Sequence, residues 1–317
     1  MRFDDGPISD FDRPIGVFDS GLGGLTVVRA LMDALPDESI LYFGDTARCP
    51  YGPRDLGEVR RFVLEIGSWL VSRDVKLIVV ACNTATAAGL ALAQRAFDVP
   101  VIGVVEPGAR AAVHATANRK VGVIGTQGTI DSGAYSKAVR ALDAGVTVFS
   151  VPAPKFVDVV EAGLRMGPGP LEQELSELAD VFIRPSFYEI ARDYLDPLKR
   201  AGIDTLVLGC THFPLLRSAI QQVVGLNVRL ISSDEETARE VANSLRRRNQ
   251  LASAGQPRRL HFATTGDAGE FAHLGSRILG TSVAGVEHVL VKTLSALPSA
   301  EGISLLDASE AVDGGDL

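Results

Sequence analysis

Two similar stretches decide the fold: KLIVVACNT at residues 76–84 and DTLVLGCTH at residues 204–212. In each, a charged residue opens a short apolar strand, which ends in a cysteine and a polar residue and leads into a helical pattern. A second pair, IGVFDSG at residues 15–21 and VGVIGTQ at residues 121–127, occurs in the same order along the chain. The repeated order indicates two similar halves, each built from strand-to-helix units.

Such units fill most of the chain. The predicted strands are continuous apolar runs, as expected of parallel strands that are buried on both faces. They cover residues 15–18, 40–43, 77–81, 101–105, 121–124, 146–151, 205–208, 228–231 and 260–263. Helical patterns are predicted over residues 24–35, 59–70, 84–97, 131–142, 215–224 and 235–248. Strands that alternate with helices predict an α/β fold with two doubly wound parallel sheets.

The repeat also predicts how the chain divides. A length of 317 residues suits two domains of roughly 150 residues each. We expect a discontinuous first α/β domain from residues 1–107 plus 238–294, and a second α/β domain from residues 108–237. The acidic segment 295–317, which is rich in small residues, is predicted to be a disordered tail.

Composition narrows the class of protein. The 31 Lys and Arg against 39 Asp and Glu give a net charge of −8 without a basic block, which argues against a nucleic acid partner. The apolar runs are too short to span a membrane, and the acidic N-terminus does not resemble a signal peptide. The 3 cysteines lack a disulfide spacing, which is typical of a reducing compartment. We therefore expect a cytoplasmic protein.

Cys82 and Cys210 are the candidate reactive residues. Each follows the carboxyl end of a predicted strand, where open α/β sheets bind their ligands. Each also precedes a helix, whose positive end and free backbone N–H groups favour a thiolate. A buried hydrophobic role is the alternative for either cysteine alone, but the matching contexts favour paired thiols. Cys49 lies on a loop without such a context and is interpreted as structural.

The loop DSGLGG at residues 19–24 follows the first strand and opens a helix. Thr26 stands where a dinucleotide-binding loop would have its third glycine, so that motif is matched only in part. A backbone cradle for a carboxylate, with Asp19 as a charged partner, fits better. The alternative is that Asp19, Ser20 and Thr84 are helix N-caps, and the same atoms can serve both purposes.

His212 lies two residues after Cys210, close enough to tune a thiol or to relay a proton. A zinc site is the rival interpretation of this Cys-x-His pattern. Four-coordinate zinc needs a second ligand pair, and Cys49 and Cys82 are not spaced like one. No metal ligand is therefore predicted.

Several longer motifs occur in order from about Ile15 to Val291. They are IGVFDSGLGGL at 15–25, YFGDT at 42–46, PYG at 50–52, ACNTA at 81–85, VIGT at 123–126, GCTHFPL at 209–215 and TTGD at 264–267. Together they resemble the glutamate racemases, cofactor-independent enzymes that supply D-glutamate for peptidoglycan. The wider aspartate/glutamate racemase superfamily shares the two cysteines without the full set of motifs. The resemblance implies two flavodoxin-like domains related by pseudo-twofold symmetry, with the active site in the cleft between them.

The resemblance also implies roles for residues at matching positions. Cys82 and Cys210 would be paired acid/base thiols, with Asp19 assisting Cys82 and His212 assisting Cys210. Glu161 matches an acid near the second thiol. The implied substrate-binding residues are Asp19, Ser20, Pro50, Tyr51, Gly52, Asn83, Thr84, Thr126, Thr211 and His212.

Three features of the sequence depart from the family pattern and bear on the role of Glu161. Ala153-Pro154 stands where the family often has Cys-Pro, and Ser232-Ser233 stands where Asp-Ser is common. An inserted helical stretch around residues 171–194 lengthens the spacing between Glu161 and Cys210.

Paired thiols suit racemisation because a proton must leave one face of the α-carbon and another must reach the opposite face. The predicted function is interconversion of L-glutamate and D-glutamate without a cofactor, by an enzyme expected to form a homodimer. An aspartate racemase is the alternative among enzymes. A module that binds an amino acid or a nucleotide without catalysis is the alternative outside them.

Overall fold

The computed structural model describes residues 11–165, 185–255 and 257–296. The predicted tail from residue 297 onward and residues 171–184 of the predicted insertion lie outside the described residues.

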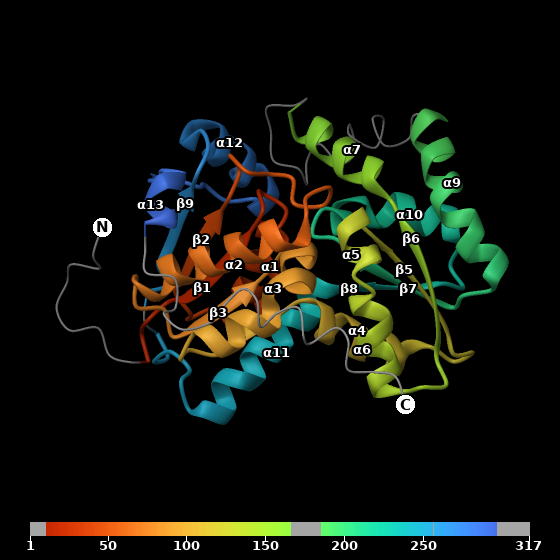
Figure 1. The fold of residues 1–317 in the computed structure, drawn as a ribbon, viewed down its shortest axis with the longest axis horizontal. Coiled ribbons are helices and arrows are strands. Elements are labelled where there is room, and N and C mark those ends of the chain that lie inside the picture. The colour runs from red at the N-terminus through yellow and green to blue at the C-terminus, as the bar shows by residue number, and fades with distance from the viewer. Residues whose placement is uncertain (1–10, 166–184, 256, 297–317) are drawn as a thin grey trace.

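Two parallel sheets form the framework of the protein (Figure 1). The strand order is β10-β9-β2-β1-β3-β4 in the larger sheet and β6-β5-β7-β8 in the smaller one, and all neighbours pair in parallel. The strands are β1 (Ile15–Asp19), β2 (Ile40–Gly44), β3 (Leu77–Val80), β4 (Val101–Gly103), β5 (Lys120–Gly125), β6 (Thr147–Pro152), β7 (Thr205–Gly209), β8 (Arg229–Ser232), β9 (Leu260–Thr264) and β10 (Glu287–His288).

The two sheets repeat one strand order. The segment β2-β1-β3-β4 of the larger sheet corresponds to the whole of the smaller sheet, β6-β5-β7-β8. This is the beginning of the flavodoxin-like order, in which the first strand lies between the second and the third. β3 and β7, which lead to the two cysteines, therefore occupy equivalent positions, and the predicted pair of doubly wound α/β sheets is confirmed.

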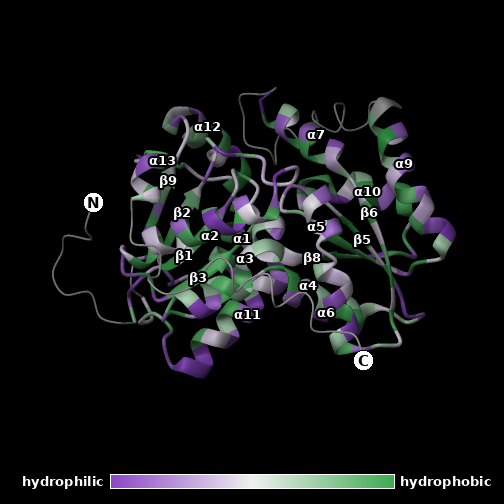
Figure 2. Cartoon of the chain, in the orientation of Figure 1, coloured by the Kyte–Doolittle hydropathy of each residue, from purple (hydrophilic) through white to green (hydrophobic). Residues whose placement is uncertain are grey.

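Helices flank both sheets, and Figure 2 shows hydrophobic strands inside and hydrophilic stretches on the outer helices. The α-helices are α1 (Leu25–Ala34), α2 (Leu56–Val71), α3 (Asn83–Ala96), α4 (Val105–Ala115), α5 (Gln127–Asp131), α6 (Ala134–Leu142), α7 (Pro154–Arg165), α9 (Pro185–Ala201), α10 (Arg217–Val224), α11 (Ser233–Arg248), α12 (Ala268–Leu279) and α13 (Val291–Ser295), with a 3₁₀ turn η1 (Phe213–Leu216). None of the helices in the described ranges has the length and hydropathy needed to cross a membrane.

Burial on both faces explains why the strands read as unbroken apolar runs. In β1, Val17 packs in a core that includes Leu25 and Val28 of α1, whereas Phe18 packs in a second core with Val59 and Phe62 of α2. All six of these side chains are buried. Successive residues of one strand thus face opposite layers of helices, as expected of a doubly wound sheet.

Some predicted boundaries are wrong. The strand predicted at 101–105 ends at Gly103, and Val105 already begins α4, because a proline at position 107 is accommodated in the first turn of a helix. The helix predicted at 131–142 is divided into α5 and α6 at Gly133, whose φ of 64° is left-handed. The short β10 and the helices α4, α7, α12 and α13 were not predicted.

The predicted domain boundaries at 107/108 and 237/238 fall inside α4 and α11. α11 packs against both α1 of the larger sheet's half and α4, which itself covers β7 and β8. The division of the chain into those ranges stays a prediction. Below, "first half" means the larger sheet with its helices, and "second half" means the smaller sheet with its helices.

Candidate active site

The strand ends that carry the predicted site residues come together between the two sheets. Asp19 ends β1 of the first half, and its Oδ1 accepts a hydrogen bond from Thr211 Oγ1 of the second half at 3.3 Å. The hydroxyls of Thr84, at the start of α3, and Thr126, before α5, lie 2.9 Å apart and share a hydrogen bond. Because both contacts join residues of different halves, one site is assembled from the two.

Cys82 lies at the N-terminus of α3, directly after β3. Its Sγ accepts a hydrogen bond from the Ala85 backbone N–H at 3.5 Å and lies 3.8 Å from Ser20 Oγ. Burial, and next the Asp19 carboxylate, raise the pKa of Cys82 to about 12, although the Ala85 N–H and Ser20 lower it. Cys82 is therefore a thiol at neutral pH.

Cys210 follows β7 in the equivalent position, but its partners differ. Its Sγ lies 3.7 Å from His212 Nδ1, and His212 Nε2 lies 3.5 Å from Glu161 Oε1. Burial opposes a charge on the imidazole, but Cys210 and Glu161 outweigh it and raise the pKa of His212 to about 10. The adjacent His212 imidazole in turn lowers the pKa of Glu161, although burial opposes this. The second thiol thus has a cation beside it at neutral pH.

Asp19 lies between these two sets of partners and is completely buried. Its Oδ2 accepts a hydrogen bond from the Gly21 backbone N–H at 2.9 Å. Burial raises the pKa of Asp19, while the charge of His212 and the backbone N–H groups of its own loop lower it. Since Asp19 also influences the pKa of Cys82, it couples the two thiol environments electrostatically.

Most of the remaining predicted site residues are also buried. Cys82 and Cys210 are each only 5% exposed, and Ser20, Asn83 and Thr211 are buried with them. The approach of the two halves is close at Gly23, where an added Cβ would lie 2.8 Å from His212 Nδ1. The two cysteines therefore lie almost entirely inside the junction of the halves.

The loop with Pro50, Tyr51 and Gly52 joins the same site. The Gly52 carbonyl accepts a hydrogen bond from the Gly128 backbone N–H in α5 at 3.0 Å. Tyr51 is buried, and its hydroxyl donates to the Asp45 carboxylate at the end of β2. Pro50 lines a cavity of about 210 Å³ that Glu161 also lines. All the residues predicted for the site therefore lie around one junction between the halves.

Three residues at this junction were not predicted as part of it. Cys49, interpreted above as structural, has its Sγ 3.9 Å from Glu161 Oε1 and lines the same cavity. Thr129 hydrogen-bonds to both Thr84 (3.2 Å) and Thr126 (2.9 Å), and its spacing of three from Thr126 at a helix start could have indicated it. Tyr135 contacts Asn83 from α6, and no local sequence signal distinguishes it.

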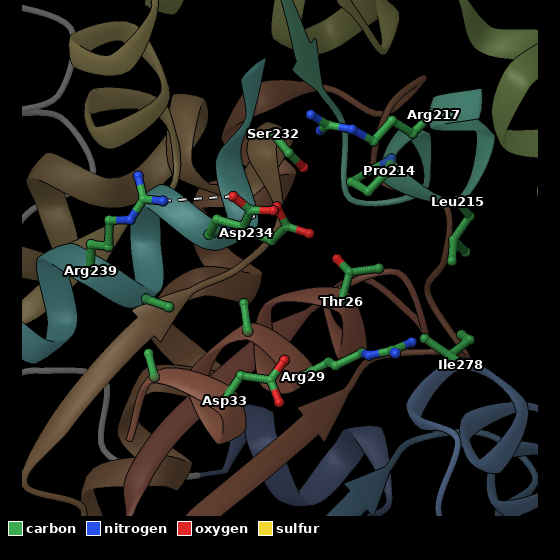
Figure 3. Close-up of a pocket in the computed structure, with 14 residues that line it drawn as sticks. Thr26, Arg29, Asp33, Pro214, Leu215, Arg217, Ser232, Asp234, Arg239 and Ile278 are labelled. Atoms are coloured by element: carbon green, nitrogen blue, oxygen red, sulfur yellow. Dashed lines mark hydrogen bonds and ion pairs between the residues drawn. The ribbon is translucent and has the colours of Figure 1, made fainter. Parts of the chain in front are cut away.

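A larger cavity of about 670 Å³ adjoins the site on the side of α1 (Figure 3). Thr26, Arg29 and Asp33 line it from α1, and Ser232 and Asp234 line it from the β8–α11 junction. Thr26 Oγ1 also lies 3.3 Å from the Thr211 carbonyl oxygen, to which it donates. Through Thr26 this cavity borders the segment that carries the second thiol.

Comparison with known proteins defines the class. The family model described as Asp/Glu/Hydantoin racemase matches residues 24–241, which include both cysteines, the whole smaller sheet, and β2, β3 and β4 of the larger sheet. The protein is therefore a member of this class of α/β racemases.

Closer relatives specify the family within the class. A glutamate racemase of Corynebacterium diphtheriae is 48% identical over 276 residues, covering 87% of this chain and 97% of that protein. The crystal structure of a glutamate racemase isoform from Bacillus anthracis has 43% identity and a TM-score of 0.78, covering 88% of this chain and 98% of the other. A glutamate racemase from Francisella tularensis, solved in complex with D-glutamate, has 32% identity and a TM-score of 0.78 over 89% of this chain and 99% of the other. The chain belongs to the glutamate racemase family.

Proposed function

We propose that the protein interconverts L-glutamate and D-glutamate, with Cys82 and Cys210 as the two groups that exchange protons with the α-carbon. The observation that carries this proposal is the pair of buried thiols at equivalent strand ends of the two halves, each with its own polar partners. A thiol on each side of one substrate can act on both faces of a carbon without moving around it.

The two partner sets differ in charge. Protonated His212 lies beside Cys210, where its positive charge is available to stabilise the negative charge of a reacting thiolate, and Glu161 keeps His212 charged. Cys82 has no such cation among its described partners, and its raised pKa of about 12 keeps it a thiol. For the enantiomer whose α-proton faces Cys210, the Cys210 thiolate takes that proton, and the electron pair of the C–H bond stays on the substrate. The Cys82 thiol then donates its proton to the opposite face.

The reverse direction requires the opposite pairing, a Cys82 thiolate with a Cys210 thiol. In the forward reaction Cys210 gains a proton and Cys82 loses one. The reaction therefore ends in this pairing. An enantiomer of the product's configuration can then react and restore the first pairing. Each sulfur therefore alternates between base and acid.

Hydrogen-bond donors must also stabilise the negative charge that the substrate gains when its α-proton leaves. Buried donors surround the junction: the hydroxyls of Ser20, Thr84 and Thr211 and the amide of Asn83. The N-terminus of α3 adds backbone N–H groups and the positive end of its dipole. In a site closed to water these interactions gain strength. They support the binding of an α-carboxylate at this position.

The physiological part of the proposal goes further. We propose that the enzyme works in the cytoplasm as a homodimer, uses no added cofactor, and supplies D-glutamate for peptidoglycan. The relatives' names and the D-glutamate complex of the Francisella tularensis enzyme support the substrate.

The proposal is tested by incubating purified protein with L-glutamate in deuterated water without any cofactor. We expect optical rotation to decay to zero while D-glutamate accumulates with deuterium at the α-carbon. Faster turnover of aspartate under the same conditions would favour the alternative racemase. Tight glutamate binding without exchange of the α-proton would contradict catalysis and favour a binding module.

A further inference from the structure

Tyr135 contacts both cysteine-bearing turns, although it belongs to neither. It lies at the start of α6 in the second half and is only 2% exposed. Its hydroxyl donates a hydrogen bond of 2.8 Å to Asn83 Oδ1, in the first half, directly after Cys82. Its ring packs against Gly209, directly before Cys210, where an added Cβ would lie 2.9 Å from the ring. One side chain therefore touches the neighbour of each thiol.

The hydrogen bond to Asn83 has a direction. Since the phenol donates to Oδ1, the amide oxygen of Asn83 is occupied and Nδ2 points elsewhere. Asn83 is 2% exposed, and among the described residues its Nδ2 is buried without a hydrogen-bond partner. A buried donor without a partner is costly unless something accepts from it. A carboxylate bound at the start of α3 would satisfy it.

The same hydrogen bond sets the orientation of the Asn83 amide. Tyr135 donates to Oδ1 at 2.8 Å, and both side chains are only 2% exposed. If the amide turned over, Nδ2 would replace Oδ1 opposite the phenol, and the buried hydrogen bond that Tyr135 donates would be lost.

We propose that Tyr135 is a positioning residue of the racemase, which holds the Asn83 amide so that Nδ2 donates to the substrate carboxylate. This inference rests on the proposed function, because it concerns the same substrate. Tyr135 acts through Asn83 and does not itself exchange a proton with the substrate. It also links the turn after β3 with the end of β7, directly before Cys210. This contact fixes the position of the Asn83 amide relative to both thiols.

The test is a double-mutant cycle with Tyr135→Phe and Asn83→Ala. Phenylalanine retains the ring packing on Gly209 and removes only the hydroxyl. We expect Tyr135→Phe to raise the KM for glutamate and lower kcat/KM by roughly tenfold in both directions. In the Asn83→Ala background, Tyr135→Phe should change kcat/KM by less than about twofold, because the group through which it acts is gone. A merely structural role would give additive losses.

Tyr188→Phe is the matched control. Tyr188 lies on α9, and its hydroxyl hydrogen-bonds to Gln222 of α10 at the protein surface. The change removes the same atom, and we expect kcat and KM to stay at the wild-type values. Thermal unfolding of both phenylalanine variants shows whether Tyr135→Phe is folded like the control.

The outcomes separate the two proposals. Wild-type turnover of glutamate tests the function, and the ratio of variant to wild type tests Tyr135. Kinetic constants of Tyr135→Phe within twofold of wild type, or an additive cycle, overturn the positioning role while the function stands. If the wild type acts on aspartate, the same cycle is measured with aspartate. If calorimetry finds no binding of either amino acid and neither is turned over, the proposed function and the positioning role of Tyr135 are both wrong.

Discussion

The segments 76–84 and 204–212 occupy equivalent places in the two sheets, yet they are anchored by opposite charges. Lys76 is completely buried, lies 2.6 Å from Glu38 Oε2, and donates to the carbonyl oxygens of Phe11 and Gln250. Asp204 is partly exposed and accepts hydrogen bonds of 2.7 Å from the backbone N–H groups that follow α4. Both side chains fix the beginning of a strand to neighbouring chain. The two segments therefore both begin with a charged residue that binds neighbouring chain, but the sign of its charge and its partners differ.

The other ends of the two segments differ in the same way. Cys82 has Ser20 and Asp19 nearby, a hydroxyl and an acid, whereas Cys210 has His212 backed by Glu161. The two directions of racemisation are chemically equivalent, but the partners of the two thiols differ. Because L- and D-glutamate have equal free energies, kcat/KM must be equal in the two directions, and the asymmetry can be observed only in kcat and KM separately.

The strongest test of this comparison removes one thiol at a time. We expect Cys82→Ala and Cys210→Ala each to lower racemisation by about 10³-fold or more, since each removes one of the two groups proposed to exchange a proton with the α-carbon. Each variant should still exchange the α-proton of one enantiomer with deuterated water, and the two variants should prefer opposite enantiomers. Nuclear magnetic resonance of each pure enantiomer measures this. Exchange of both enantiomers by a single variant would contradict the assignment of one thiol to each face.

The next test concerns the anchor of the first segment. Lys76→Met leaves the Glu38 carboxylate buried without its cation, which should lower the free energy of unfolding by about 3–5 kcal/mol. Urea denaturation at pH 7 measures the loss. Glu38→Gln added to Lys76→Met removes the unpaired charge and should recover part of the stability. If the double variant were less stable than Lys76→Met, the buried charge could not be the cause.

The third test separates the two thiol environments by pH. His212 remains protonated up to its raised pKa of about 10, and Glu161 is one cause of that increase. Glu161→Gln removes the negative charge, so His212 loses its proton at a lower pH, and the alkaline decline of kcat/KM should shift down by roughly one pH unit. Rates from pH 6 to 10 measure the shift. Glu236→Gln on α11, which affects only a surface pair with Arg239, should leave the profile unchanged.

The smallest effect is expected at the anchor of the second segment. Burial opposes the charge of Asp204, but hydrogen bonds from the Thr116 hydroxyl and two backbone N–H groups outweigh it and lower its pKa. Asp204→Asn should reduce the free energy of unfolding by about 0.5–1 kcal/mol at pH 7, because the site is partly exposed. A lowered pKa contributes stability that is lost as pH falls through the native value. The difference from wild type should therefore shrink as the pH falls below the usual range of a carboxyl group, and a constant difference would assign the loss to packing.

The framework was predictable because parallel strands buried on both faces leave a continuous apolar signal, and because the two halves repeat it. Val17 and Phe18 face different cores, so neither position in β1 could be polar. The short β10 was missed because two residues carry too little pattern to separate a strand from a loop. Local spacing also could not show that α4 begins at Val105, directly after an apolar strand.

The positions of the candidate site residues were predictable where a residue adjoins a strand end, as Asp19, Cys82 and Cys210 do. They were not predictable where a side chain arrives from a distant element. Tyr135 reaches Asn83 across 52 positions in sequence, and Cys49 reaches Glu161 across 112. Such contacts depend on how the halves pack together, which no local pattern encodes.

The burial of both cysteines has a consequence for the rate of the enzyme. Because each cysteine is only 5% exposed, we expect the two halves to part before a polar amino acid enters and again before the product leaves. When those motions are slower than C–H cleavage, deuterium at the α-carbon barely slows turnover, whereas a more viscous solvent slows it markedly.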